Sequence, residues 1–220
     1  MAIIDLPYTF PDPEKADDQG LLAVGGDLSP TRLLAAYSQG IFPWFDDDYP
    51  ILWWSPNPRL LLIPQEFKVS PSLKKSLKKP YLYTFDKAFE QVIDACASVD
   101  KRATSTWITH DMQQAYIELH RLGYAHSVEI WSVDKLIGGL YGISLGKAFF
   151  GESMFHKERD TSKIALFYLC QLLSGWHFDF IDCQLPTPHL QSLGAIVVSR
   201  HEFLKRLHQT LQHPTRKEIW

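Results

Sequence analysis

The sequence predicts an α/β protein in which strands form a mixed sheet and helices alternate with them along the chain. Two patterns predict this class. Several segments repeat apolar residues with the period of an amphipathic helix, and three consecutive segments alternate apolar and polar residues with the period of a strand. The chain has 220 residues, 45% hydrophobic and 21% charged, which suits one large domain, or one domain with a small partner.

The first part of the chain predicts one helix among loops. Ser29 is a capping residue, Pro30 fits the first helical position, and Gly40 ends the segment. The apolar stripe of this helix consists of Leu33, Leu34 and Tyr37. The rest of this part is rich in Pro and Gly, and we expect it to form loops folded over aromatic side chains.

The character of the sequence changes at Pro56–Arg59. Regular strand and helix patterns follow, beginning with the short apolar strand Leu60–Ile63. We therefore expect a small N-terminal domain at residues 1–58 and a larger domain at residues 59–220.

Three helical segments come next, at Ser70–Lys79, Asp86–Ser98 and Thr109–Leu122. The first carries two lysine pairs spaced four residues apart, so the lysines share one helical surface. These residues are Lys74, Lys75, Lys78 and Lys79. Such a surface is either a solvated helix face or a place where RNA backbone binds, and the spacing alone leaves both readings open.

A three-stranded antiparallel meander is predicted after these helices. Its strands are Ala125–Val133, Leu136–Ser144 and Lys147–Phe155, joined by turns at Asp134–Lys135 and Leu145–Gly146. The strand patterns contain several glycines that match no phosphate-binding fingerprint, and we interpret them as bulges or close backbone approaches. They are Gly138, Gly139, Gly142 and Gly146.

The last part of the chain alternates helix and strand patterns. Its elements are a helix from Thr161 or Ser162 through Leu173, a strand Phe178–Gln184, a short helix Thr187–Leu193, a strand Ala195–Val198, and a final helix opened by the capping box of Ser199 and Glu202. The order of elements is that of acyl-transferring enzymes of the acetyltransferase superfamily, so we expect an acetyltransferase-like domain.

Charge and aromatic content restrict the possible partners. The 22 basic and 25 acidic residues give a net charge of −3, so any contact with nucleic acid must be local. Aromatic residues make up 13% of the chain, and Trp44, Trp53 and Trp54 are clustered. This cluster predicts either a core or the wall of a ligand site.

Cysteine, histidine and hydropathy patterns argue against metal sites and membranes. Cys96, Cys170 and Cys183 lie far apart and are interpreted as reduced core thiols, and no histidine spacing predicts a metal site. No segment approaches the ~20 apolar residues of a bilayer span, and the first residues do not resemble a signal peptide. We expect a cytoplasmic protein.

Three polar residues are candidates for chemistry. Asp182 and Gln184 alternate at the end of an apolar strand, so their side chains point to the same side, although Asp182 could instead cap a neighbouring loop. Glu152 follows the apolar run Ala148–Phe150, where a carboxylate is costly unless paired. Glu152 therefore binds a cation or faces solvent at the strand edge.

Assembled in order, these segments resemble the bacterial leucyl/phenylalanyl-tRNA-protein transferase family. The strings that carry the resemblance run across most of the chain and are Gly20–Ser29, Gly40–Trp44, Trp53–Arg59, Thr106–Ile108, His126–Glu129, Gly151–Phe155, Ile181–Gln184 and Ser192–Ala195.

The resemblance implies an enzyme that moves Leu or Phe from Leu-tRNA or Phe-tRNA to proteins with N-terminal Arg or Lys, and so marks them for degradation. It implies a small N-terminal domain before an acetyltransferase-like domain. We expect no cofactor, no metal, no membrane contact, and a monomer that binds the 3′ aminoacyl end and the acceptor stem of the tRNA.

The resemblance also implies roles for particular residues. Asp182 and Gln184 are the expected catalytic pair, while the proton acceptor stays open, because a route through the tRNA ribose fits equally well. Glu152 and Tyr37 are expected to bind substrate. The donor side chain is expected to lie against Trp44, Trp107, Leu140, Leu169, Leu173 and Ile181, and the resemblance favours phosphate binding by Lys74, Lys75, Lys78 and Lys79.

Departures from the family leave the preference among Leu, Phe and Met open. Leu140 stands where methionine is frequent, and Leu169 and Leu173 stand where larger aromatics occur. Two other functions compete with the resemblance. One is an acetyl-CoA-dependent N-acetyltransferase, whose expected pyrophosphate loop is absent between Phe155 and Thr161. The other is a non-catalytic RNA-binding or degradation-adaptor protein, which the intact Asp182 and Gln184 disfavour.

Overall fold

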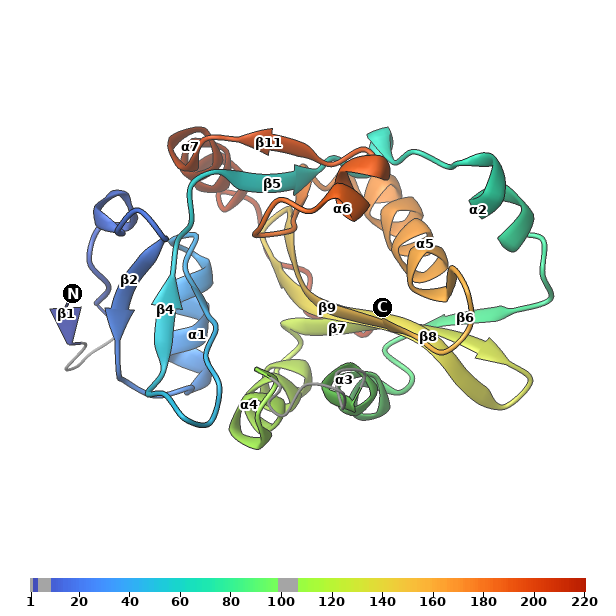
Figure 1. Cartoon of the computed structure of the whole chain (residues 1–220), viewed down its shortest axis with the longest axis horizontal. Helices are drawn as coiled ribbons and strands as arrows, with labels where there is room; N and C mark the ends of the chain where they lie inside the picture. Colours follow the sequence, from blue (N-terminus) through green and yellow to red (C-terminus); the bar gives the residue numbers. More distant parts are fainter. Residues whose placement is uncertain (1, 4–8, 99–106) are drawn as a thin grey trace.

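The computed structural model describes residues 2–3, 9–98 and 107–220, and it contains two sheets (Figure 1). The smaller sheet has the strand order β1-β2-β4-β3, and the larger has the order β11-β5-β10-β9-β8-β7-β6. The larger sheet is mixed: β10 runs parallel to β9 and antiparallel to β5. The predicted α/β class with a mixed sheet is therefore confirmed.

The smaller sheet corrects the expectation of loops before residue 59. Its elements are β1 (Ala2–Ile3), η1 (Pro13–Lys15), β2 (Leu21–Val24), α1 (Pro30–Tyr37), β3 (Phe42–Pro43) and β4 (Leu52–Trp54). Strands of two to four residues are too short to show alternation, which is why the sequence predicted only the helix. The capping of α1 is as predicted, because the Ser29 hydroxyl accepts a hydrogen bond from the Arg32 backbone N–H.

The predicted meander is confirmed and extended in the larger sheet. Its strands are β5 (Arg59–Leu62), β6 (Leu82–Phe85), β7 (Ala125–Ser132), β8 (Lys135–Leu145), β9 (Ala148–His156), β10 (Phe180–Asp182) and β11 (Ile196–Val198). The pairs β7–β8 and β8–β9 are antiparallel. The strand predicted at Phe178–Gln184 is shorter than expected, and β6 was not predicted.

Helices cover both faces of the larger sheet. They are η2 (Pro64–Glu66), α2 (Pro71–Ser76), α3 (Phe89–Ser98), α4 (His110–Arg121), α5 (Thr161–Gly175), α6 (Pro188–Ser192) and α7 (Arg200–Thr210). In Figure 1, α3 and α4 lie below the sheet and α5 lies above it. Two predicted helix bounds were wrong: α2 ends at Ser76, so Lys78 and Lys79 follow the helix, and α3 begins at Phe89, because Asp86 has a φ of 54°.

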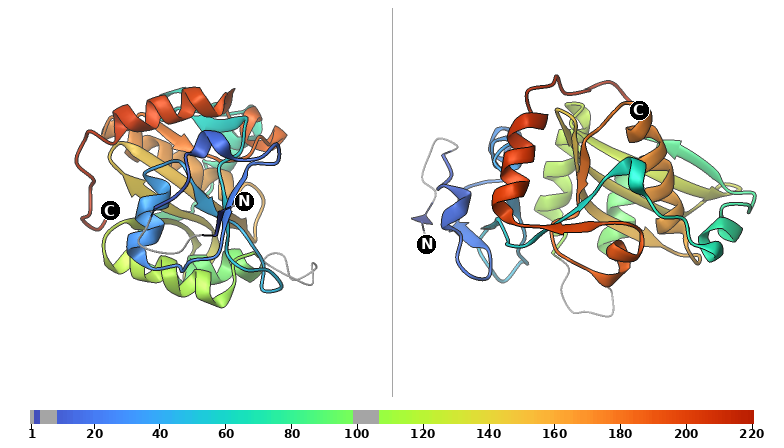
Figure 2. Two further views of the ribbon diagram at one scale, coloured as in Figure 1. Left: turned by 90° about the vertical axis from the view of Figure 1, so that its left-hand side faces the viewer. Right: turned by 90° about the horizontal axis from the view of Figure 1, so that it is seen from above.

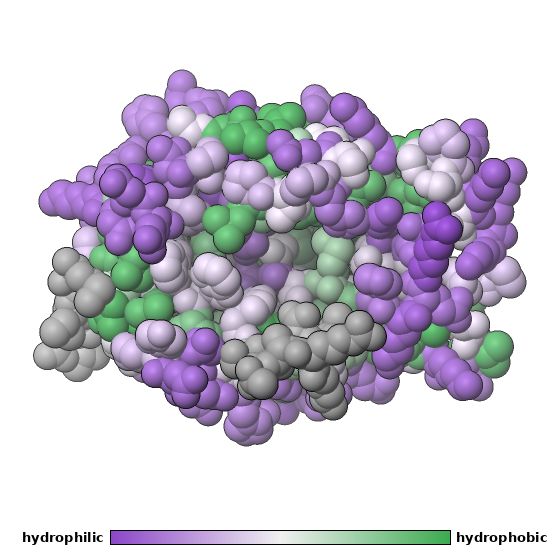
Figure 3. Space-filling view, in the orientation of Figure 1, coloured by the Kyte–Doolittle hydropathy of each residue, from purple (hydrophilic) through white to green (hydrophobic). Residues whose placement is uncertain are grey.

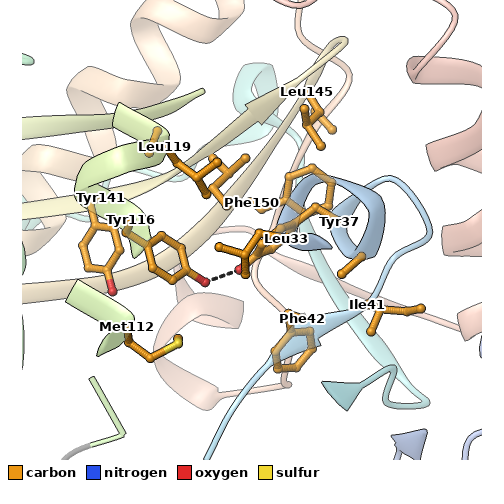
Figure 4. Packing of buried hydrophobic residues seen from close by; sticks show 14 of the residues in the cluster. Leu33, Tyr37, Ile41, Phe42, Met112, Tyr116, Leu119, Tyr141, Leu145 and Phe150 are labelled. Atoms are coloured by element: carbon orange, nitrogen blue, oxygen red, sulfur yellow. Dashed lines mark hydrogen bonds between the residues drawn. The ribbon is translucent and has the colours of Figure 1, made fainter. Parts of the chain in front are cut away.

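Alternation along the meander separates two cores. Tyr141 and Phe150 belong to the cluster on the α3 and α4 side, whereas Leu140 and Phe149 belong to the cluster under α5. The first cluster also includes Leu33 and other residues of the N-terminal part, as Figure 4 shows. Apolar packing is thus continuous across residue 59, and the division into residues 1–58 and 59–220 stays a prediction.

The helix α7 lies at the end of the larger sheet that faces the N-terminal part (Figure 2). Its Phe203 ring makes an edge contact with Phe180 of β10, at a centroid distance of 6.1 Å. A Cβ atom on Gly40 would lie 2.6 Å from the Phe203 ring, so α7 also packs closely against the turn after α1. Since Gly40 has a φ of +74°, this turn favours glycine on both counts.

Candidate active site

Strands β9 and β10 separate after three residue pairs, and the candidate site lies where they part. The pairing ends with Asp182 opposite Phe150, while β9 continues beside β8 to His156. A β-bulge occurs just past this point, because Tyr141 pairs with Ser153 and Gly142 with Gly151. Glu152 is therefore the additional residue of the bulge, a position that redirects a side chain from the regular strand pattern.

Asp182 is bound on both carboxylate oxygens. Its Oδ1 accepts from Arg59 Nε at 2.8 Å and its Oδ2 accepts from Arg59 Nη2 at 2.6 Å, with Asp182 fully buried and Arg59 1% exposed. Oδ1 also accepts from the Gln184 backbone N–H at 3.0 Å. A buried ion pair with two parallel hydrogen bonds holds both side chains in one geometry. Asp182 thus fixes the backbone of Gln184, whose φ is 56°.

Glu152 is the polar centre of the site. Its Oε1 accepts from Gln184 Nε2 at 3.2 Å, and its Oε2 accepts from Tyr116 Oη at 3.0 Å. Tyr116 is in turn hydrogen-bonded to Tyr37, as the dashed line in Figure 4 shows. Burial raises the pKa of Glu152 to about 7, although the tyrosine hydrogen bonds oppose this shift. Glu152 can therefore exchange a proton near neutral pH.

Two cavities meet at this centre, and both are lined by Glu152, Cys183 and Gln184. The first has a volume of about 300 Å³, and its other lining residues are Leu140, Tyr141, Phe149, Gly151, Ser153, Met154, Leu166, Leu169, Ile181 and Leu190. The second has a volume of about 210 Å³, and its other lining residues are Phe42, Pro43, Trp44, Trp107, Leu185 and Thr187. In the space-filling view, the face of the molecule is hollowed near its centre (Figure 3).

The structure divides the predicted donor pocket between these two cavities. Leu140, Leu169 and Ile181 line the first cavity, and Trp44 and Trp107 line the second. Leu173 lies in the core beside the first cavity and is absent from both linings. Thr106, from the string Thr106–Ile108, lies outside the described residues.

The remaining predicted residues lie farther from the cavities. Tyr37 is 1% exposed and lines neither cavity, and its hydroxyl lies beside Tyr116 and helps to lower the pKa of Glu152. Asp182 is likewise not among the lining residues. The four lysines are exposed on α2 and the turn after it, which packs against α5; they are Lys74, Lys75, Lys78 and Lys79.

Sequence reasoning missed the partners of the predicted residues. Arg59 has a place at the predicted boundary near residue 59 and in a matching string but no predicted role, yet it forms the ion pair with Asp182. Tyr116 is not among the candidate residues singled out from the sequence, yet its hydroxyl donates to Glu152. A charged residue at the start of a fully apolar strand, such as Arg59 before Leu60–Leu62, is the signal that could have been followed.

The described parts of the chain were compared with the requirements of a metal-binding cluster and of a membrane-spanning helix. No group of His, Cys, Asp and Glu within those parts is arranged to hold a metal ion. Among the helices that the structure describes, none combines the length and apolar character that a bilayer span requires.

Two cavities that meet at a carboxylate and an amide can hold two reactants side by side, an arrangement that suits a group-transfer enzyme. A family model described as leucyl/phenylalanyl-tRNA protein transferase matches residues 61–208, and the model of the N-terminal domain of the same family matches residues 26–57. The chain belongs to the leucyl/phenylalanyl-tRNA protein transferase family. It is an aminoacyltransferase that moves an aminoacyl group from tRNA to protein.

Relatives support this assignment over nearly the whole chain. A leucyl/phenylalanyl-tRNA–protein transferase of Legionella pneumophila (strain Corby) is 62% identical over 216 residues, covering 98% of this chain and 97% of the relative. The transferase of Lawsonia intracellularis (strain PHE/MN1-00) is 54% identical, covering 94% of this chain and 91% of the relative. Among solved structures, a functionally unknown conserved protein from Staphylococcus epidermidis ATCC 12228 is 8% identical, covering 81% of this chain and 68% of its own, with a TM-score of 0.46.

Proposed function

We propose that the enzyme transfers Leu or Phe, and also Met, from charged tRNA to the N-terminal amine of proteins that begin with Arg or Lys. The product then carries an N-terminal residue that marks it for degradation. The observation that supports this reaction best is the junction of two cavities at Glu152 and Gln184. One cavity is suited to the donor side chain and the other to the acceptor residue.

The first cavity is the donor side-chain pocket in this proposal. Its volume is about 300 Å³, and most of its wall is apolar. Glu152 and Gln184 supply polar groups at one place in the wall. An apolar side chain that enters this cavity loses its hydration favourably, whereas a charged one would lose hydration without a partner deep in the pocket. Leu, Phe and Met suit this wall, and we expect β-branched side chains to fit poorly close to the ester.

The second cavity receives the cationic acceptor residue. Its walls include the rings of Phe42, Trp44 and Trp107, whose faces attract Lys and Arg. Glu152 borders the same cavity and supplies a carboxylate for the cation or for the attacking amine. An acceptor that begins with Ala has no cationic side chain for the rings or for Glu152 and should react much more slowly.

The reaction forms one bond and breaks one. The neutral amine attacks the ester carbonyl, a C–N bond replaces the C–O bond to the ribose, and one proton moves from the amine to the released ribose oxygen. The amine has a reference pKa of about 7.7 to 8.0, so a weak base is sufficient. Glu152 carries the proton in this proposal, and the alternative is direct transfer between the substrates.

Gln184 positions the reactants, and Asp182 positions Gln184. The Nε2 group of Gln184 lies 3.2 Å from Glu152 Oε1, so the amide faces the junction of the cavities and can hold the carbonyl or the amine. Asp182 is occupied by Arg59 and by the Gln184 backbone, which favours a positioning role.

The exposed lysines on and after α2 would bind phosphates of the acceptor stem. They lie together on an otherwise acidic protein of net charge −3, so the contact is local. We also propose an acetyltransferase-like larger sheet, since β9 and β10 are parallel and part at the site. A monomer in the cytoplasm, where charged tRNA is made, completes the proposal.

Single-turnover transfer of labelled leucine tests the function. Charged tRNA is mixed with the enzyme and a short peptide that begins with Arg, beside a matched peptide that begins with Ala. We expect transfer to the Arg peptide alone. Equal transfer to both peptides would contradict the acceptor rule, and no transfer despite binding of charged tRNA would contradict the reaction.

A further inference from the structure

A third cavity lies beside the donor pocket, at the N-terminus of α5. Its volume is about 690 Å³, and its lining residues are Met154, His156, Arg159, Asp160, Ser162, Lys163 and His189. Met154 also lines the first cavity, so the two cavities share a wall. The two cavities are therefore neighbours on either side of the Met154 side chain.

The first turn of α5 offers backbone donors to the cavity. The helix has 15 residues, and its N-cap residue Asp160 makes no side-chain capping hydrogen bond. The Thr161 N–H bonds to the Glu158 carbonyl, but the N–H groups of Ser162 and Lys163 have no acceptor within the described parts of the chain. Free N–H groups and the helix dipole together favour an anion at this position.

Ser162 gives a second, independent sign of a ligand. Its side chain is 6% exposed and lines the cavity, yet its hydroxyl makes no hydrogen bond to any residue that the structure describes. The hydroxyl oxygen keeps some solvent access through the cavity and is free to donate a hydrogen bond to an acceptor atom placed there.

The charges around the cavity favour an anion. Arg159 and Lys163 supply two cations against Asp160, the one carboxylate of the lining. Asp160 accepts from the Ser76 hydroxyl at 2.9 Å and forms ion pairs with Lys163 Nζ at 3.2 Å and Arg159 Nε at 3.8 Å. Desolvation, followed by the positive charges of Lys163 and His156, lowers the pKa of His189. The local potential that a ligand meets is therefore positive.

We propose that this cavity binds a backbone phosphate at the 3′ end of the donor RNA. The inference rests on the proposed function, because it places the aminoacyl side chain in the first cavity. The ribose would then lie near the shared wall at Met154, and its 5′-phosphate would enter the third cavity. The Ser76–Asp160 hydrogen bond joins α2 to this end of α5, so the RNA strand could continue directly onto the exposed lysines.

Binding of two matched, unreactive donor analogues tests the site. They are the 3′-leucylamido analogue of adenosine and the same molecule with a 5′-phosphate, and their affinities are measured by titration calorimetry. We expect the phosphate to tighten binding to the unchanged protein about tenfold, as a charge-assisted contact allows. Arg159→Ala and Ser162→Ala should each remove most of this advantage.

Lys205→Ala is the matched control, since Lys205 is an exposed cation on α7, at the far end of the sheet. It should keep the full advantage of the phosphate. Circular dichroism and the thermal midpoint check that each variant is folded. The proposal is overturned if the phosphate gives the unchanged protein no advantage, or if folded Arg159→Ala and Ser162→Ala proteins both retain it.

Transfer from charged tRNA separates this inference from the proposed function. If the phosphate gives the unchanged protein no advantage in binding, while that protein transfers leucine to the Arg peptide, the result contradicts the third cavity alone. A protein that binds the phosphate analogue tightly but transfers nothing contradicts the function and leaves the anion site standing.

Discussion

Glu152 lines both cavities, and burial raises the pKa of its carboxyl group to about 7. Below this pKa the group is protonated and cannot accept the amine proton. In the unchanged protein, we expect kcat/KM to rise with pH up to about 7. In Glu152→Gln, we expect kcat/KM to be lower by about 100-fold or more and the rise near pH 7 to disappear. Only the titration of the substrate amine near 8 should remain in the variant. A pH profile of transfer to the Arg peptide measures both effects.

Tyr116→Phe provides the matched comparison. The hydrogen bonds from the tyrosines lower the pKa of Glu152, so removal of the Tyr116 hydroxyl should move the lower step of the pH profile upward. An unchanged midpoint in Tyr116→Phe, together with a Glu152→Gln protein that keeps the step, would show that Glu152 is not the proton acceptor.

Replacements of Asp182 and Gln184 should have different effects on the stability of the protein. Asp182→Asn leaves the buried Arg59 guanidinium without its ion-pair partner, so we expect a loss of about 3–5 kcal/mol in unfolding free energy together with a loss of transfer. Gln184→Ala keeps that ion pair, and it should lose transfer with stability nearly unchanged. Urea denaturation and single-turnover transfer measure the two effects. A stable but inactive Asp182→Asn protein would indicate a direct catalytic role instead.

The bulge in β9 is the element that directs Glu152 to the cavities, and β8 must approach closely for it to form. A Cβ atom on Gly142 would lie 2.1 Å from the Phe150 carbonyl oxygen, whereas one on Gly151 would have its nearest neighbours at 3.7 Å. Gly142→Ala should therefore destabilise the protein by about 1–3 kcal/mol, and Gly151→Ala should be close to neutral. Thermal denaturation compares the two, and equal midpoints would contradict the close approach.

The length of an element decided whether the sequence could predict it. The long meander strands and the helices α1, α4 and α7 show enough periods and capping residues to be identified. Strands β2, β3, β4 and β6 have two to four residues and were missed, because pairing with neighbours rather than alternation defines them. Apart from the resemblance, Asp182, Gln184 and Glu152 were identifiable as polar residues at the ends of apolar runs. Their partners were not, because Arg59 meets Asp182 across 123 residues of chain.

At the scale of the whole molecule, the net charge opposes binding of RNA, whereas a few exposed lysines favour it. The net charge of −3 repels a polyanion, so binding should depend on the few cations that face it. Replacing Lys74 and Lys75 together with Ala should make the slope of log K against log salt for charged tRNA shallower by about 1.8, since each phosphate that a lysine neutralises contributes about 0.9. Lys15→Ala, which removes an exposed cation from the N-terminal part, is the control. Filter binding over a range of salt concentrations measures the slope, and equal slopes in all three proteins would show that Lys74 and Lys75 do not bind the RNA.

The position of β5 in the larger sheet has a consequence for biosynthesis. This strand, early in the chain, lies between β10 and β11, which come from the last fifth of the sequence. On a ribosome, Arg59 is synthesised long before Asp182, so the ion pair and the pairing of β5 with β10 and β11 form only after the last part of the chain is made. Such late long-range closure slows folding and leaves an exposed strand edge on the nascent chain. Prematurely terminated chains lacking these strands should therefore have no residual transfer activity and should be recognised as unfinished by chaperones or proteases.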